Sequence, residues 1–291
     1  MPFRRSILLL VIAFITAQFS WAAPHLPGDG IKTTLVVSPI LEERFQAFLI
    51  EEALKKLGYQ VQPYHVKTYK EGLEGIAQGT FTYSASFWAP LHQKMLDDLP
   101  TQPTFTIKKP FISGAAQGYL IDKKTAKKHN IHTLTDLQDS KIATLFDSNH
   151  DGKADLLGCQ PDWGCASVIE HQLKRYQLTS SIQHHQNSYS EGLDTILRRF
   201  KAGKSVFYYT WTPHWISSML KPNTDVVWLE VPFSAHPQNI DTTLVTGKNY
   251  GFNINNIHII SLKSFTLAHP AAGKLFALAR LSIGEVSAQN K

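Results

Sequence analysis

The chain has 291 residues, with 29 Lys and Arg, 23 Asp and Glu and a formal net charge of +6. The basic residues are spread along the sequence and do not form the clustered stripe of a nucleic-acid-binding surface, so we expect no nucleic-acid partner. The length exceeds that of one ordinary domain and predicts two lobes.

The first 22 residues have the pattern of a secretory signal peptide. Arg4 and Arg5 give a positive start, residues 7–15 are apolar, and Ser20-Trp21-Ala22 predicts cleavage near Ala22. A membrane anchor is the alternative, but the run is shorter than the roughly 20 residues of a spanning helix. No cysteine directly follows the cleavage site, which argues against a lipid anchor. We therefore expect a periplasmic protein, secreted through the inner membrane.

The first half of the mature chain alternates strand and helix patterns. Strands are predicted over residues 32–37, 59–66 and 80–88, and apolar residues at three- and four-residue steps predict helices over 39–57 and 69–78. This order is typical of a mostly parallel sheet with helices on both faces. Ligands gather at the carboxyl ends of strands in such sheets, and Trp88 stands at one of those ends.

The second half predicts two crossings between lobes. Residues 114–121 indicate a strand that enters a second lobe, and the chain crosses back near residues 250–252. The remaining predictions are helices over 189–200 and 270–281 and strands over 205–210, 225–231 and 257–261. Two crossings make a hinge. The predicted division is residues 23–115 and 253–291 in lobe 1 and residues 116–252 in lobe 2.

A short loop contains both cysteines of the chain. It reads Cys159-Gln160-Pro161-Asp162-Trp163-Gly164-Cys165, so any intramolecular disulfide closes it, and an exported protein is expected to pair two cysteines. Trp163 and Gly164 stand at the predicted start of a helix. An aromatic face attracts a cation and a helix N-terminus attracts an anion, so this pair suits a ligand with both charges. Trp88 and Trp211 have similar settings.

Residues 147–158 resemble part of a calcium loop. Asp147, Asn149 and Asp151 occupy the first, third and fifth positions with a glycine at the sixth, and Asp155 adds a carboxylate. The twelfth position is Gly158 where a bidentate Glu belongs, so the match is incomplete. The alternative is an Asx-rich turn that satisfies its own backbone. We predict no cofactor, with structural calcium at these carboxylates and Asn149 as the open possibility.

Several segments together resemble the periplasmic glycine betaine/proline betaine-binding proteins of osmoprotective ABC transporters. The similar segments cover nearly the whole mature chain and lie at residues 26–28, 54–59, 114–125, 146–158, 163–165, 207–213 and 226–235. The resemblance implies an α/β, two-lobe periplasmic binding protein fold (type II-like) that closes on a betaine. It also implies delivery of that ligand to a membrane permease with its cytoplasmic ATPase. We expect a monomer without enzymatic activity.

The resemblance also implies the ligand contacts. A cage of three tryptophans falls on Trp88, Trp163 and Trp211, a Cys159–Cys165 disulfide shapes the middle of the three, and the carboxylate contacts fall on His92 and on the backbone of Gly164 and Cys165. A quaternary ammonium has no N–H to donate, so aromatic faces are left to bind it, each contributing about 0.5 to 2 kcal/mol.

His92 follows Trp88 by four residues, so both should face one cleft if a helix begins at Pro90. Trp215 and Trp228 are interpreted as core residues. Chains of this family continue beyond the region of Leu281 with a largely helical segment, whereas this sequence stops at Lys291. Every predicted cage residue lies upstream of that difference.

Three alternatives remain open at this point. Choline and carnitine share the cationic head, although choline lacks the carboxylate that the donors at Gly164 and Cys165 require. A cysteine hydrolase would use Cys165 as a nucleophile beside His92, and it needs a free thiolate. A structural or adhesive exported protein has only the calcium-loop pattern in its favour and lacks the usual repeats.

Overall fold

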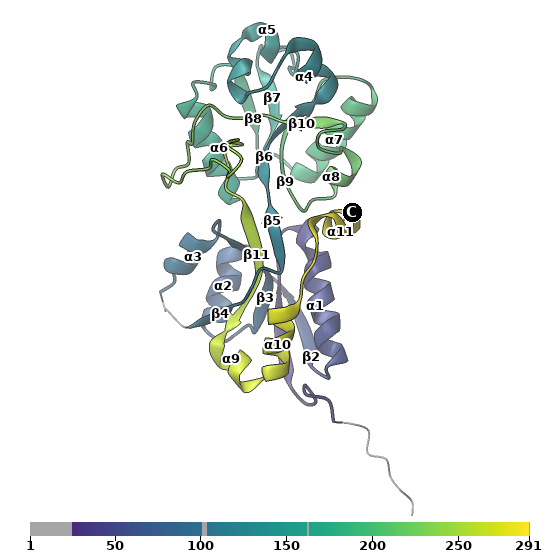
Figure 1. The fold of residues 1–291 in the computed structure, drawn as a ribbon, viewed down its shortest axis with the longest axis vertical. Coiled ribbons are helices and arrows are strands. Elements are labelled where there is room, and N and C mark those ends of the chain that lie inside the picture. Colours follow the sequence, from purple (N-terminus) through teal and green to yellow (C-terminus); the bar gives the residue numbers. More distant parts are fainter. Residues whose placement is uncertain (1–24, 101–103, 162, 291) are drawn as a thin grey trace, which may run out of the picture.

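The computed structural model describes residues 25–100, 104–161 and 163–290. The predicted signal peptide therefore lies outside the described residues. Two α/β lobes are stacked along the long axis, and β5 (Ile112–Ala115) and β11 (Asn255–Leu262) run between them (Figure 1). None of the helices in these ranges has the length and apolar character of a membrane span. The predicted two-lobe α/β architecture is confirmed.

Lobe 1 is built on a six-stranded sheet in the order β2-β1-β3-β11-β4, with β5 paired to β11. Its other strands are β1 (Lys32–Val37), β2 (Gln60–His65), β3 (Tyr83–Ala89) and β4 (Phe105–Ile107). Its helical elements are η1 (Leu41–Glu43), α1 (Arg44–Lys56), α2 (Tyr69–Ala77), α3 (Gln93–Asp97), α9 (Lys263–Ala268) and α10 (Pro270–Leu278). The β-branched run of β1 is buried at Leu35, Val36 and Val37, as its apolar sequence predicts.

Lobe 2 contains a five-stranded sheet in the order β10-β6-β9-β7-β8. Its strands are β6 (Gln117–Asp122), β7 (Ala154–Leu157), β8 (Ile182–His185), β9 (Phe207–Trp211) and β10 (Val226–Trp228). Its helical elements are α4 (Lys123–His129), η2 (Leu134–Gln138), α5 (Ser140–Ala143), α6 (Gly164–Arg175), α7 (Tyr189–Lys201) and α8 (Ile216–Met219). The Asp122 side chain caps α4 by accepting the Thr125 N–H at 2.7 Å.

Both sheets are mixed rather than mostly parallel. β1 pairs in parallel with β2 and β3, and β7 pairs in parallel with β8 and β9, as the β-α-β order predicts. The crossing strands differ, because β11 is antiparallel to β3 and β6 is antiparallel to β9. Each of these strands carries the chain away from the junction of the lobes, whereas β3 and β9 run toward it. The sequence pattern does not show this reversal of strand direction.

The last helix, α11 (Ile283–Gln289), lies at the junction of the lobes (Figure 1). It contacts α1 and β5 of lobe 1 and α8 of lobe 2. The division at residues 115 and 253 therefore stays a prediction.

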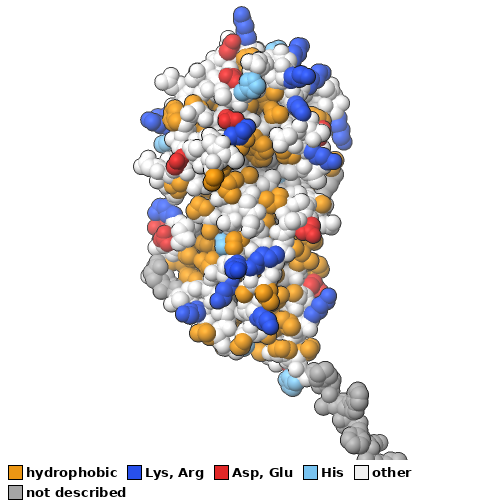
Figure 2. All heavy atoms as spheres, in the orientation of Figure 1, with side chains coloured by type: hydrophobic (Ala, Val, Ile, Leu, Met, Phe, Trp, Pro, Cys, Tyr) orange, Lys and Arg blue, Asp and Glu red, His pale blue; other side chains and the backbone are white. Residues whose placement is uncertain are grey.

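On the face drawn in Figure 2, Lys and Arg side chains are distributed over both lobes with acidic side chains among them.

Candidate functional site

The candidate site is a cleft at the junction of the lobes, where the carboxyl ends of β3 and β9 and the start of α6 meet. It contains about 400 Å³ of space between protein atoms, part of it open to solvent. Every residue predicted to contact the ligand lines this cleft: Trp88, His92, Trp163, Gly164, Cys165 and Trp211. The remaining lining residues are Ile40, Glu43, Tyr69, Leu91, Gln117 and Tyr209.

The three indoles come from both lobes and are fixed by packing. Trp88 is the penultimate residue of β3 in lobe 1, and Trp211 ends β9 of lobe 2; each is 4% exposed. The ring centroids of Trp163 and Trp211 are 5.4 Å apart, with their planes at 85°. Tyr189 stacks on Trp211 at 5.2 Å. We call Trp88, Trp163 and Trp211 the tryptophan cage, and their role in ligand binding stays a prediction.

Backbone donors adjoin the cage at the start of α6. Trp163 has extended backbone angles and is the N-cap residue, so Gly164 and Cys165 are the first two residues of the helix. The N–H groups of the first helical turn have no acceptor within their own helix, and the helix dipole makes them attractive to an anion. An aromatic face and two donors therefore lie side by side at Trp163, as the sequence predicts.

The predicted Cys159–Cys165 disulfide is confirmed, with the two Cα atoms 6.0 Å apart. It joins the strand-to-helix loop that carries Trp163 to the first turn of α6. Both cysteines of the chain are in this bond, so no thiolate remains for a cysteine hydrolase. That alternative is wrong.

His92 lies in the cleft in a single neutral tautomer. Its Nδ1 accepts the Trp88 N–H at 3.2 Å, so the proton of a neutral ring is on Nε2, which is then a donor. Burial lowers the pKa of His92 to about 3, which keeps the ring neutral at physiological pH. The imidazole is also held against the Tyr69 ring, with centroids 4.1 Å apart.

The local helix differs from the prediction. α3 begins at Gln93 rather than Pro90, and His92 is its N-cap residue. A turn replaces the expected first helical residues, and in it the His92 N–H donates to the Trp88 carbonyl oxygen at 2.7 Å. This turn brings the side chains of Trp88 and His92 to the cleft, as was expected of the predicted helix.

Sequence reasoning missed two acidic residues in η1. Glu43 lines the cleft and its Oε1 accepts the Trp88 Nε1–H. Glu42 reaches across to lobe 2, where Trp215 Nε1–H donates to its Oε1 at 3.2 Å and His214 Nε2 lies 3.5 Å from the same atom. In a helical pattern, acids near the N-terminus are expected on the solvated face, so the sequence carries no signal for their burial.

Two further residues in the cleft were also missed. The Tyr209 hydroxyl donates to Gln117 Oε1 at 2.7 Å, which joins adjacent strands β9 and β6 beneath the cage. Trp228 packs against the core as predicted, while Trp215 is half-buried and also forms the contact with Glu42 between the lobes.

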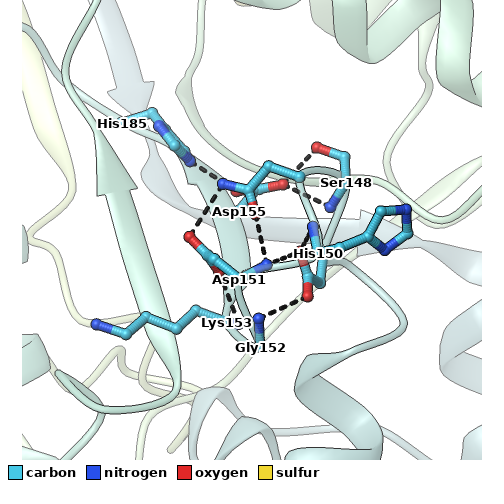
Figure 3. A network of polar contacts seen from close by, with 9 residues as sticks. Ser148, His150, Asp151, Gly152, Lys153, Asp155 and His185 are labelled. Carbon is cyan, nitrogen blue, oxygen red and sulfur yellow. Dashed lines mark hydrogen bonds and ion pairs between the residues drawn. The ribbon is translucent and has the colours of Figure 1, made fainter.

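The loop at residues 147–155 is closed by its own hydrogen bonds (Figure 3). Asp147 accepts the N–H groups of His150 at 2.7 Å and Gly152 at 2.8 Å. Asp155 accepts from Ser148, and its other oxygen lies 2.7 Å from His185 Nε2. Among the described residues, no three His, Cys, Asp or Glu are grouped to hold a metal. These contacts are those of an Asx-rich turn, and calcium binding stays a hypothesis.

The turn interpretation predicts that calcium and a chelator leave the melting temperature unchanged, because the carboxylates already have backbone and side-chain donors. Differential scanning calorimetry in each condition measures this. If chelation lowers the melting temperature and Asp151→Asn removes that response, the loop is a structural calcium site instead.

Comparisons with known proteins agree with this geometry. Residues 33–291 match the family described as the substrate binding domain of the ABC-type glycine betaine transport system. The glycine betaine/proline betaine-binding periplasmic protein of Escherichia coli (strain K12) is 48% identical over 270 residues, covering 92% of this chain and 82% of that protein. The protein of the same name from Salmonella typhimurium (strain LT2) is 46% identical, covering 98% and 88%.

A solved structure supports the fold. Lactococcal OpuAC in its closed-liganded conformation with glycine betaine superposes with a TM-score of 0.65 at 18% identity, covering 88% of this chain and 87% of that one. Two α/β lobes around a cleft define the class of two-lobe substrate-binding proteins. Within that class, the chain belongs to the family of substrate-binding domains of ABC-type glycine betaine transport systems.

Proposed function

We propose that this protein captures glycine betaine or proline betaine in the tryptophan cage and delivers it to an ABC permease for osmoprotection. The observation that carries the proposal is the placement of three indoles beside the donors of Gly164, Cys165 and His92 in one cleft. Aromatic faces suit a quaternary ammonium, and N–H donors suit a carboxylate. The two kinds of group match the two ends of a betaine.

The chemistry of binding follows from where the groups lie. The methylated head packs between Trp88 of lobe 1 and Trp163 and Trp211 of lobe 2, so the ligand contacts both lobes. Its carboxylate receives N–H groups at the start of α6 and the Nε2–H of His92. Closure of the lobes removes water from the cleft, which strengthens the cation–π and charge-assisted contacts.

Membership of the family supports a proposal for the location and the partner. The two curated relatives described above are named as periplasmic proteins, and we propose the same compartment for this chain after removal of the signal peptide near Ala22. The proposed partner is a membrane permease with its cytoplasmic ATPase. We further propose a monomer that binds no nucleic acid. On the face drawn in Figure 2, the basic side chains are spread over both lobes with acidic side chains among them.

A thermal-shift screen tests the function. We expect glycine betaine and proline betaine to raise the melting temperature, because a ligand at about 100 times its Kd stabilises the folded state by roughly 2.7 kcal/mol. Choline should raise it less, since it leaves the donors of Gly164, Cys165 and His92 without a carboxylate. An equal shift with choline or carnitine would reassign the ligand, and no shift with any quaternary ammonium would contradict the proposal.

Reduction of the Cys159–Cys165 disulfide should weaken binding more clearly than it destabilises the fold. A loop this short contributes about 2 to 3 kcal/mol in the chain-entropy model, whereas the bond positions Trp163 and the first N–H groups of α6. Titration with glycine betaine and melting curves, each with and without reductant, separate the two effects. Equal affinity for glycine betaine in both redox states would show that the disulfide does not have this role.

A further inference from the structure

Glu43 is a buried acid beside the tryptophan cage that the proposed ligand contacts do not use. It ends η1 as the N-cap residue of α1 and is 2% exposed. Among the described residues that line the cleft, it is the only one with an acidic side chain. The cleft that is proposed to hold a cation thus has one negative group in its wall.

The contacts of Glu43 leave its charge uncompensated. Oε1 accepts the indole N–H of Trp88, while Oε2 has no hydrogen-bond partner among the described residues. The hydroxyl groups of Ser38, Tyr69 and Ser86 lie near the carboxyl and favour its ionised form, although none of them is in hydrogen-bonding geometry with Oε2. Among the described residues, Glu43 is in no ion pair. A buried carboxylate without a cation is costly in the empty protein, so a ligand that brings a positive charge removes part of that cost.

We propose that Glu43 is the counter-charge of the tryptophan cage and positions Trp88 for the cationic head of the ligand. The inference rests on the proposed function and adds a residue to it. Glu43 acts in two ways: its own negative charge attracts the cation through a cleft of low dielectric, and its hydrogen bond draws the indole N–H, which increases the negative charge of the ring face. It is a positioning residue, because it holds the Trp88 indole by a hydrogen bond and is not itself a proposed ligand contact.

The proposal has a pH signature. Burial raises the pKa of Glu43 to about 7. A bound cation stabilises the ionised form and lowers this pKa, so affinity rises with pH from the lowered pKa up to about 7 and is constant above it. The pKa values of the neighbouring groups are shifted away from 7.

Glu42 has a lowered pKa although burial opposes it, because His214 and Trp215 hydrogen-bond its carboxylate. Burial lowers the pKa of His214 on the opposite lobe and that of His92, the latter to about 3. Burial raises the pKa of Tyr69 well above its ordinary value. The α-carboxylate of the ligand stays ionised at these pH values.

The test is calorimetric titration of the full chain with glycine betaine at about pH 5.5 and about pH 8.5, for the wild type and Glu43→Gln. Glutamine keeps an oxygen that accepts the Trp88 N–H and removes the charge. We expect the wild type to lose roughly tenfold in affinity at the lower pH. The variant should bind equally at both pH values, with the affinity of the wild type at low pH. Melting of the ligand-free variant should be unchanged or raised.

Trp88→Phe provides the matched control, because it keeps a ring in place and removes the donor. In the Trp88→Phe background, Glu43→Gln should reduce the affinity for glycine betaine less than it does in the wild type. An undiminished loss of affinity would overturn the route through the indole. The proposal is overturned if, at high pH, the Glu43→Gln variant binds glycine betaine as tightly as the wild type does. It is also overturned if the variant binds weakly but its affinity still depends on pH. The wild-type pH profile alone tests it if the variant does not fold.

The affinity of the wild type at the two pH values distinguishes the role of Glu43 from ligand binding itself. A wild-type protein that binds glycine betaine with the same affinity at both pH values contradicts only the role of Glu43. A wild-type protein that binds no glycine betaine at either pH contradicts the proposed function.

Discussion

Replacing Trp88, Trp163 or Trp211 with alanine is expected to weaken glycine betaine binding by about 1 to 3 kcal/mol for each residue. Each substitution removes one aromatic face for the cation and the apolar contact of an indole with the methyl groups. Trp211→Ala also removes the ring on which Tyr189 stacks, so it should lie at the upper end of that range. Phenylalanine should recover part of the loss, because it retains a smaller π-face.

Trp228→Ala is the control for this series, because Trp228 is in lobe 2 but does not line the cleft. It packs over Gly118 and near Tyr250, and we expect it to cost about 3 kcal/mol of folding stability while leaving affinity nearly unchanged. Trp215→Ala should act differently again, since it removes the Glu42 contact between the lobes. Cage variants that bind like the wild type would exclude the aromatic mechanism.

Stripping methyl groups from the ligand should produce the second large effect. From glycine betaine to dimethylglycine, sarcosine and glycine, the head becomes more strongly hydrated and gains N–H groups for which the indole faces offer no conventional acceptor. Desolvation therefore costs more at each step while the cation–π contact with Trp88, Trp163 and Trp211 contributes less. We expect affinity to fall at every step, by an amount on the order of tenfold or more for the complete series.

A competition assay with glycine betaine as the reference ligand ranks the four compounds. All four carry the same carboxylate, so the donors at Gly164, Cys165 and His92 are equally used and the head group is the only variable. If sarcosine or glycine binds as tightly as glycine betaine, recognition lies at the carboxylate end and not in the cage.

The local elements of the fold were largely predictable, and its long-range pairing was not. The first strand has the predicted bounds, because a β-branched run between turn residues leaves little choice. Strand direction depends on where the chain crosses between lobes, and a one-dimensional pattern does not show that β6 and β11 return against their neighbours. The helix expected at Pro90 failed for a similar reason, since the turn at His92 is fixed by contacts with Trp88.

The candidate site was likewise predictable only in part. The Trp163 loop was conspicuous because both cysteines flank it, and the family resemblance supplied Trp88, Trp211 and His92. Glu43 was not predictable, because an acid at the first turn of an amphipathic helix has a complete explanation in the helix dipole. Its burial arises from the Trp88 indole contributed by another element, and Tyr69 likewise reaches the cleft only through tertiary packing.

Isothermal titration of glycine betaine into the wild type and into the double variant Trp163→Ala/Trp211→Ala tests the central claim most directly. The account predicts saturable binding with one ligand per wild-type chain, and loss of more than tenfold in affinity in the double variant at an unchanged oligomeric state. Binding of glycine betaine with equal affinity by both proteins would contradict the claim that the tryptophan cage between the lobes recognises the quaternary ammonium.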